Sequence, residues 1–291
     1  MTLRVALVQV SAGTDVRQNQ HKAEQLIREA AKNGAELVAL PENFLFRGPS
    51  REMQELSLKL KPITLSFCRL AQELKIRLLL GSVPEPTGER GKVFNTSIFI
   101  LPTGEVPVRY KKLHLFAATL PDGTQIDESQ SSRGGNRVLT FKDGEWTFGF
   151  TVCYDLRFPE LFRVQSQAGV NVFFVPANFT KATGTAHWQV LLRARAIENL
   201  AYVLAPAQCG FDPGHRIETY GHSLAVSPWG EIMAELGDAE GTGIAELNLQ
   251  ALSDARKRLP ALTHRRTDML KVEIRDRRAE AFAAQQPDPR G

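Results

Sequence analysis

Two segments in opposite halves of the chain share one pattern, an apolar stretch closed by Pro-x-Asn-Phe. Residues 37–44 read Leu-Val-Ala-Leu-Pro-Glu-Asn-Phe, and residues 172–179 read Val-Phe-Phe-Val-Pro-Ala-Asn-Phe. A short continuous apolar run is typical of a strand that is covered on both faces. We therefore favour a pseudo-symmetric α/β fold with two sheets stacked face to face and helices outside, a four-layer α-β-β-α sandwich, over a single doubly wound sheet.

The remaining chain alternates strand-like and helix-like segments in both halves. The first half predicts strands at 3–10, 36–40, 77–83, 93–101 and 105–111, with helices at 20–33 (capped by Asn19) and 65–75. The second half predicts strands at 146–153, 171–175, 201–205, 221–226, 231–234 and 243–247, with helices at 159–167, 186–200 and 250–258. No linker-like segment divides the chain, so we expect one domain over 1–270. Residues 271–291 are expected to form a C-terminal tail, at a subunit interface or disordered.

Composition excludes several classes of protein. The 291 residues are 43% hydrophobic and 23% charged, which is typical of a soluble globular protein. The net charge of +4 comes from scattered basic residues and does not favour nucleic-acid binding. No apolar run approaches the roughly 20 residues that span a bilayer, and residues 1–10 lack the long apolar region of a signal peptide. We expect no membrane contact.

The cysteines indicate a reducing compartment. Cys68, Cys153 and Cys209 are odd in number and far apart, which argues against a disulfide framework. The sequence contains neither C-x-x-C nor H-E-x-x-H, so no metal site is predicted. We therefore expect a cytoplasmic protein.

Three chemically active side chains follow predicted strands, at the edge where open α/β sheets bind their ligands. Cys153 is a candidate nucleophile, although taken alone it could be an inert buried thiol. Glu42 could accept the thiol proton, and Lys112 could favour the thiolate and stabilise an oxyanion. Glu128, in a loop, is a candidate second carboxylate that orients the lysine or the leaving amine. Together these four residues predict nucleophilic catalysis.

The motifs around these residues resemble those of the nitrilase superfamily of carbon–nitrogen hydrolases. They are Pro-Glu-Asn-Phe at 41–44, Tyr-x-Lys-x-His-Leu-Phe at 110–116 and Cys-Tyr-Asp-x-Arg-Phe-Pro-Glu at 153–160, and the resemblance spans residues 4–266. It implies that Glu42 is the general base, Lys112 the oxyanion-stabilising cation, Cys153 the nucleophile and Glu128 the second glutamate. The backbone N–H of Tyr154 would complete the oxyanion hole.

The resemblance also implies the overall chemistry. It implies the α-β-β-α sandwich, a homodimer formed across one helical layer, a small-molecule amide as substrate, and no metal or organic cofactor. Cys153 would attack the amide carbonyl, the amine would leave, and Glu42 would activate water to hydrolyse the thioester.

Motifs in the second half suggest the branch of the superfamily. Residues 183–188 and 191–199 resemble Nit-type amidases, and residues 207–210, 220–223, 228–230 and 264–266 resemble deaminated-glutathione amidases more than ω-amidases. Such an enzyme would release 2-oxoglutarate and cysteinylglycine from deaminated glutathione, a metabolite-repair reaction. The alternatives are an ω-amidase acting on α-ketoglutaramate, an N-carbamoyl amide hydrolase, a true nitrilase, a Cys–His protease and a non-catalytic nitrilase-like binding module.

Two positions depart from the pattern of the relatives near the expected pocket. Ala117 stands where the lysine motif commonly continues with Asp, and Asn178 interrupts a segment that commonly reads Ser/Ala-Ala-Phe. We expect Asn178 and Phe179 to position the substrate, and we expect Ala117 and Asn178 to influence specificity.

Other polar residues of the second half receive structural roles. Arg157, Asp155 and Glu160 are expected to form a network that fixes the turn carrying Cys153. His187 and Trp188 are expected to open a helix and to serve in capping and packing.

Overall fold

Two six-stranded sheets form the centre of the protein. The computed structural model describes residues 1–119, 123 and 125–266. The first sheet consists, in order, of β16 (Gly241–Asn248), β1 (Thr2–Gln9), β2 (Leu37–Ala39), β3 (Arg77–Pro86), β4 (Val93–Ile100) and β5 (Val108–Lys111). The second consists of β8 (Thr140–Asp143), β9 (Trp146–Phe150), β10 (Val172–Phe174), β11 (Tyr202–Ala205), β14 (Leu224–Val226) and β15 (Ile232–Glu235).

The two sheets repeat one pattern of strand directions. In the first, β2 pairs in parallel with β1 and β3, and the outer pairs are antiparallel. In the second, β10 pairs in parallel with β9 and β11, and the outer pairs are again antiparallel. The two Pro-x-Asn-Phe segments therefore follow equivalent strands, as the pseudo-symmetric prediction requires.

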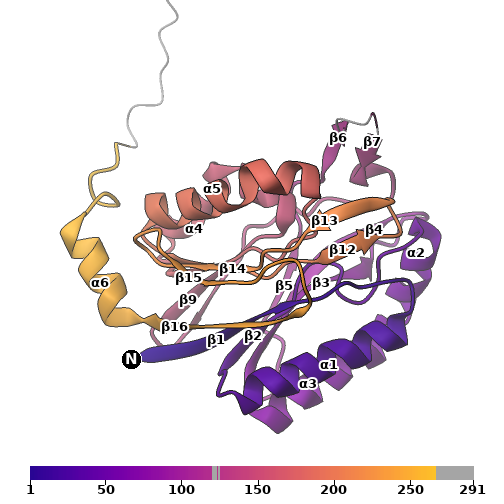
Figure 1. Cartoon of the computed structure of the whole chain (residues 1–291), viewed down its shortest axis with the longest axis horizontal. Coiled ribbons are helices and arrows are strands. Elements are labelled where there is room, and N and C mark those ends of the chain that lie inside the picture. Colours follow the sequence, from indigo (N-terminus) through magenta and orange to yellow (C-terminus); the bar gives the residue numbers. More distant parts are fainter. Residues whose placement is uncertain (120–122, 124, 267–291) are drawn as a thin grey trace, which may run out of the picture. The chain divides into compact units, whose positions relative to one another are not determined.

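Helices cover the outer face of each sheet (Figure 1). α1 (Val16–Lys32) and α3 (Leu60–Leu74) lie against the first sheet, and α4 (Pro159–Gln167) and α5 (Lys181–Asn199) lie against the second. The shorter α2 (Ser50–Leu58) precedes α3, and α6 (Leu249–Arg258) follows β16. The predicted four-layer α-β-β-α sandwich is confirmed.

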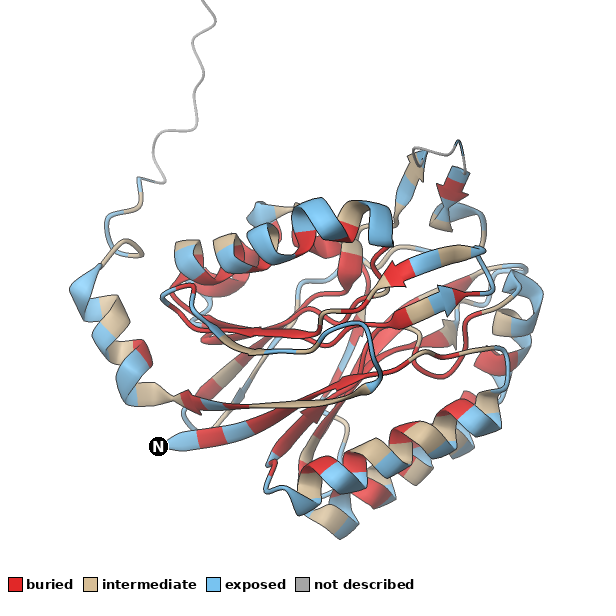
Figure 2. Ribbon diagram, viewed as in Figure 1, coloured by how far each residue is buried: buried red, intermediate tan, exposed pale blue. Residues whose placement is uncertain are grey.

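The burial of β1 shows why its residues 5–8 are all apolar. Val5 and Leu7 point into the core between the sheets, where the rings of Phe99 and Phe148 pack 5.2 Å apart. Ala6 and Val8 belong to the second core, beneath α1 and α3. In Figure 2 the inner strands of the two sheets are accordingly mostly buried, while the helices expose their outer faces. Alternate residues thus stabilise two different interlayer contacts.

Several predicted element boundaries were wrong because of capping and tertiary contacts. α1 begins at Val16, since the Asp15 side chain accepts hydrogen bonds from the N–H groups of Arg17 and Gln18. Asn19 is not the cap but a buried helical residue whose amide donates to the carbonyls of Gly13 and Leu45.

The second long helix was also placed too late. α5 begins at Lys181 behind the Thr180 cap, so His187 and Trp188 lie inside it and do not open it. α3 begins at Leu60 and not at residue 65, and β9 ends at Phe150, before Cys153. The sequence did not predict α2, β8, or the two hairpins β6–β7 (Ala117–Thr119, Gln125–Asp127) and β12–β13 (Cys209–Asp212, Ile217–Tyr220).

Residues Met1–Leu259 form one compact unit, and the chain from Pro260 onward forms a second. The described part of the second unit, 260–266, contains a turn in which the N–H of Thr263 donates to the carbonyl of Pro260. The predicted tail, 271–291, lies outside the described residues. No helix in the described part of the chain is long and apolar enough to cross a membrane.

Candidate active site

Glu42, Lys112 and Cys153 come together at the strand ends where the sequence placed them. Glu42 follows β2, Lys112 follows β5, and Cys153 begins a 3₁₀ turn after β9. All three are buried, with exposed fractions of 1%, 1% and 7%. The predicted constellation is therefore enclosed by protein, which strengthens electrostatic interactions within it.

Lys112 lies between two carboxylates. Its Nζ is 3.0 Å from Oε1 of Glu42 and 2.8 Å from both carboxylate oxygens of Glu128. Burial alone would lower the pKa of Lys112, but the charges of Glu128 and Glu42 outweigh burial and hold this pKa well above its usual value. The lysine is consequently a permanent cation at neutral pH. The second glutamate, predicted from the sequence at Glu128, is in direct contact with it.

Glu42 is held by partners from three other segments. Its Oε1 accepts hydrogen bonds from Lys112 and from Nδ2 of Asn95, at 3.0 and 2.8 Å. Its Oε2 accepts from the backbone N–H of Asn178 at 2.8 Å. Asn178 thus contacts Glu42 through its main chain, whereas its side chain contacts Asp212 and Arg47. The contact from Asn95 was missed by the sequence analysis, although an Asn within a mainly apolar strand was a usable signal.

Cys153 occupies a left-handed backbone conformation with φ of 50°. Its N–H donates to the carbonyl of Pro176 at 2.9 Å, which ties the turn to the segment after β10. Burial raises the pKa of the Cys153 thiol well above its ordinary value, and the nearby Glu42 carboxylate raises it further, against the opposing effect of Lys112. Cys153 and Glu42 line the same small cavity. The resting group is therefore a neutral thiol with a proton acceptor in the same cavity.

Asp155 fixes the turn that carries Cys153. Its Oδ2 accepts hydrogen bonds from the N–H of Val152 at 2.9 Å and from the hydroxyl of Tyr110 at 2.7 Å. Its Oδ1 accepts from the N–H of His114 at 3.0 Å and lies 2.7 Å from the Nδ1 atom of the same residue. The turn is thereby joined to the segment that carries Lys112.

The expected participation of Arg157 and Glu160 in this network was wrong. Nη2 of Arg157 lies 3.3 Å from Nδ1 of His187, and its guanidinium sits 5.5 Å from the centre of the Phe179 ring. Glu160 is exposed in the first turn of α4. The Asp155 carboxylate therefore joins its own turn to the segment that carries Lys112, through Val152, Tyr110 and His114.

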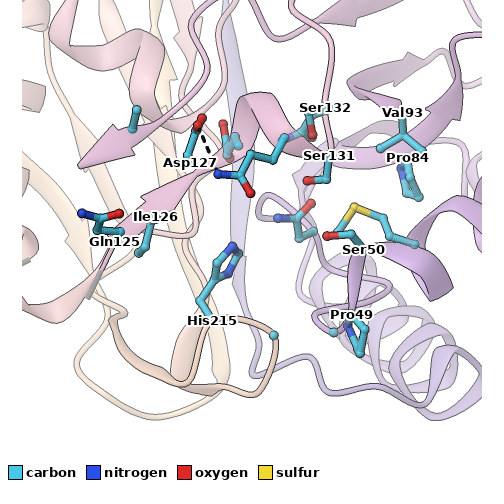
Figure 3. Close-up of a pocket in the computed structure, with 18 of the residues that line it drawn as sticks. Pro49, Ser50, Pro84, Val93, Gln125, Ile126, Asp127, Ser131, Ser132 and His215 are labelled. Carbon is cyan, nitrogen blue, oxygen red and sulfur yellow. Dashed lines mark hydrogen bonds between the residues drawn. The ribbon is translucent and has the colours of Figure 1, made fainter. Parts of the chain in front are cut away.

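Two cavities with shared lining residues lie at the site, and Cys153 lines the smaller one. The smaller, of about 40 Å³, is lined by Cys153, Glu42, Tyr154 and Phe179, among others. The larger, of about 540 Å³, is lined mainly by the β6–β7 hairpin, the 128–132 segment and the beginning of α2, and it includes Ala117 (Figure 3). Both are lined by Asn43, Ile126, Glu128 and His215. Every predicted site residue therefore lines the smaller cavity or contacts a residue that does.

Two buried charged residues, Arg47 and Asp212, hold the side chain of Asn178. The amide of Asn178 donates to Oδ2 of Asp212 at 2.9 Å, and its Oδ1 accepts from Nη1 of Arg47 at 3.4 Å. Burial lowers the pKa of Arg47. Burial would raise the pKa of Asp212, but hydrogen bonds from His215 and Asn178 and the charges of His215 and Arg47 lower it to about 2. The roles of Arg47, Asp212 and His215 could not be predicted from the sequence, because no local motif joins these residues.

The described residues contain no cluster of side chains suited to bind a metal ion. Among residues 1–119, 123 and 125–266, no group of three or more His, Cys, Asp or Glu residues is arranged to hold a metal ion.

The fold and the family identify the class of the protein as an enzyme that cleaves carbon–nitrogen bonds. The chain belongs to the carbon-nitrogen hydrolase family, whose model matches residues 4–257. It is a hydrolase of amide bonds in the Nit branch of the nitrilase superfamily.

The similar proteins include deaminated glutathione amidases and omega-amidases. The chain is 43% identical over 264 residues to a deaminated glutathione amidase of Synechocystis sp. (strain PCC 6803 / GT-S), covering 89% of this chain and 97% of that protein. It is 34% identical to the omega-amidase NIT2 of Bos taurus, covering 94% and 99%. The crystal structure of the C. elegans NitFhit protein superimposes with a TM-score of 0.87 at 32% identity, covering 93% of this chain and 66% of that one.

Proposed function

We propose that the protein hydrolyses the amide of deaminated glutathione through a thioester on Cys153. The observation that carries the proposal is the buried arrangement in which Lys112 lies between Glu42 and Glu128 while the Cys153 thiol lines the same small cavity as both carboxylates. This arrangement supplies a nucleophile, its proton acceptor and a fixed positive charge. Glu128 holds Lys112 in place.

The first half-reaction forms the acyl-enzyme. Glu42 accepts the thiol proton as Sγ of Cys153 attacks the amide carbon, and negative charge develops on the carbonyl oxygen. Nζ of Lys112 and the backbone N–H of Tyr154 stabilise that oxyanion. The C–N bond then breaks, the proton passes from Glu42 to the departing nitrogen, and cysteinylglycine leaves as the free amine.

The second half-reaction releases the acid. Glu42 removes a proton from a water molecule, which attacks the thioester carbon, and a second oxyanion forms beside Lys112. When the C–S bond breaks, the proton returns from Glu42 to the sulfur and 2-oxoglutarate is released. These steps require no cofactor and use one water molecule per turnover.

The size of the second cavity supports deaminated glutathione as the substrate. An ω-amidase releases ammonia, which needs little room, whereas deaminated glutathione releases a dipeptide. The cavity of about 540 Å³, which shares four lining residues with the cavity at the thiol, offers space for such a leaving group. The relative with 43% identity, a deaminated glutathione amidase, supports the same choice.

The test is kcat/KM of the purified protein on deaminated glutathione and on α-ketoglutaramate, with Cys153→Ala as the control. A preference for deaminated glutathione of about a hundredfold, or roughly 2.7 kcal/mol of transition-state discrimination, would support the proposal. Equal kcat/KM values for the two substrates, or a higher value for α-ketoglutaramate, would identify an ω-amidase.

We further propose that the protein is a homodimer and that it is located in the cytoplasm. Val164 on α4 and Val190 and Ile197 on α5 are exposed apolar residues, which supports a homodimer formed across this helical layer. The three cysteines are free, which supports a reducing, cytoplasmic location. Sedimentation equilibrium of the wild type and of Val190→Asp would test the dimer.

A further inference from the structure

His215 lies at the junction of the two cavities. It belongs to the turn between β12 and β13, and it lines both the cavity that contains Cys153 and the larger one beside it. In Figure 3 its imidazole projects from this turn into the hollow, between Gln125 and Ile126 on one side and Ser50 on the other. Its side chain is 43% exposed, so a ligand in the larger cavity can reach it.

Asp212 holds the imidazole and favours its charged form. Nδ1 of His215 is 3.2 Å from Oδ2 of Asp212, while Oδ1 accepts from the N–H groups of Gly214 and His215 at 2.8 and 3.2 Å. The hydrogen bond to Asp212 raises the pKa of His215, and the charges of Asp212, Glu128 and Glu42 add to this against the effect of burial. With Nδ1 directed at Asp212, the opposite edge of the ring is available to a ligand.

His215 is the cation that a ligand in the larger cavity can reach, because the nearby basic residues Lys112, Arg47 and Arg157 do not line this cavity. Among the described residues that line it, His215 alone can carry positive charge. Lys112 is paired with both Glu128 and Glu42, and Asp127 accepts hydrogen bonds from Ser129. Arg47 lies behind Asp212, and Arg157 lines the smaller cavity. The remaining polar lining residues are neutral: Asn43, Ser50, Asn95, Thr119, Gln125, Gln130, Ser131 and Ser132.

We infer that protonated His215 binds a carboxylate on the amine leaving group of the substrate, and so selects amides whose leaving group is an anionic peptide. The inference rests on the proposed function and specifies what the larger cavity recognises. The narrow cavity at the thiol receives the acyl side of the amide, and the larger cavity receives the amine side. A carboxylate at the far end of that amine meets the one positive charge among the described lining residues, which favours binding of the anion.

The test compares two substrates that differ in one group. Deaminated glutathione and its C-terminal carboxamide share the scissile bond, and the second lacks the terminal negative charge. We expect the wild type to prefer the carboxylate by about tenfold in kcat/KM, mainly through KM, because one charge-assisted contact is worth about 1.4 kcal/mol. His215→Gln should reduce this ratio to about one. His21→Gln, on the exposed surface of α1, should leave it unchanged.

The pH dependence has a definite sign. Deprotonation of His215 removes the cation, so the preference should be present at low pH and should disappear as pH rises through a pKa above 6.5. In His215→Gln the ratio should not change over this range. A tenfold preference that persists in His215→Gln would overturn the inference.

A binding experiment separates this inference from the proposed function. If the wild type hydrolyses neither substrate, the proposed function fails, but the carboxylate site can still be examined by NMR of the ¹⁵N-labelled imidazole. Cysteinylglycine should raise the pKa of His215, and cysteinylglycinamide should not. Equal effects of both dipeptides, or no effect of either, would overturn the inference.

Discussion

The two sheets share their strand order and directions but differ at the strand ends. Lys112 directly follows β5, while Leu236 follows the equivalent strand, β15. Glu42 occupies the position that Ala177 holds in the second Pro-x-Asn-Phe segment. The pairing registers place Val10 three residues after Leu7 of β1, as Cys153 lies three residues after Phe150 of β9. At each matched position, one half carries the reactive group and the other an apolar residue.

This difference shows how a symmetric scaffold can hold an asymmetric site. The proton acceptor and the cation come from the first half, and the thiol comes from the second. Neither half contains a complete set. The contact between Asn178 and Glu42 illustrates the division, because the backbone of the second half holds the carboxylate of the first. The predictions below test whether the matched positions are interchangeable.

The largest effect is expected at the thiol. Cys153→Ala should lower kcat by at least about 10⁴-fold, because no other group at this position can form the thioester. Adding Val10→Cys to this variant should not restore activity, since Val10 packs in the core beneath α1 and α3, away from Cys153. Steady-state kinetics would check both variants. Recovery of turnover would show that the two strand ends are equivalent, and normal activity in Cys153→Ala would remove the proposed mechanism.

The next largest effect is expected at Glu42. Glu42→Gln preserves shape but cannot accept the thiol proton, so kcat/KM should fall by about 10³-fold. Rapid-quench measurements should show no burst of released amine, because acylation itself is slowed. Glu29→Gln, an exposed position on α1, provides a matched control that should retain wild-type rates. A variant with a normal burst and slow turnover would assign Glu42 to hydrolysis of the thioester alone.

A smaller effect is expected at Asn178, which occupies the same position in its Pro-x-Asn-Phe segment as Asn43 does in the first half. Asn178→Ala removes the side-chain contacts with Asp212 and Arg47 but keeps the N–H that holds Glu42. We expect about a tenfold decrease in kcat/KM and a loss of about 1–2 kcal/mol in the free energy of unfolding. Asn136→Ala, at an exposed position, should change neither quantity. A loss as large as that of Glu42→Gln would mean that the Asn178 side chain itself takes part in catalysis.

The smallest effect is a pH dependence of stability. The pKa of Asp212 is lowered from 3.8 to about 2, so its contribution is complete above pH 3.8 and is lost as pH falls toward 2. Between pH 5 and 3 the wild type should lose about 1 kcal/mol more of its free energy of unfolding than Asp212→Asn. Urea unfolding at both pH values would measure the difference. Parallel pH profiles would show that Asp212 is not charged in a stabilising network.

The strands and the grouping of Glu42, Lys112 and Cys153 could be predicted because their signals are local. A buried strand such as β10 is recognisable from a few consecutive apolar residues, and Glu42, Lys112 and Cys153 each sit in a recognisable motif at a strand end. Boundaries were less predictable when a tertiary contact competed with a local pattern. Asn19 has the chemistry of a cap, but its hydrogen bond to Leu45 depends on a loop that the local sequence does not reveal.

The charged residues that contact Asn178 could not be predicted from the spacing of residues along the sequence. Arg47 and Asp212 lie far apart in the chain, and they approach Asn178 because the two sheets pack face to face. The β12–β13 hairpin that presents His215 contains Gly210, Pro213 and Gly214, and it has no long apolar alternation to mark its strands. Its position beside the cavity is a result of the fold as a whole.

The left-handed backbone at Cys153 sets activity against stability. A residue with a β-carbon adopts this conformation at a cost of about 1 kcal/mol, which glycine does not incur. Replacement of the nucleophile by glycine would therefore relieve strain in the same step that destroys catalysis. A library of this protein sorted for thermal resistance alone would be expected to enrich inactive chains at this position, so any attempt to make the enzyme more robust has to screen for turnover as well.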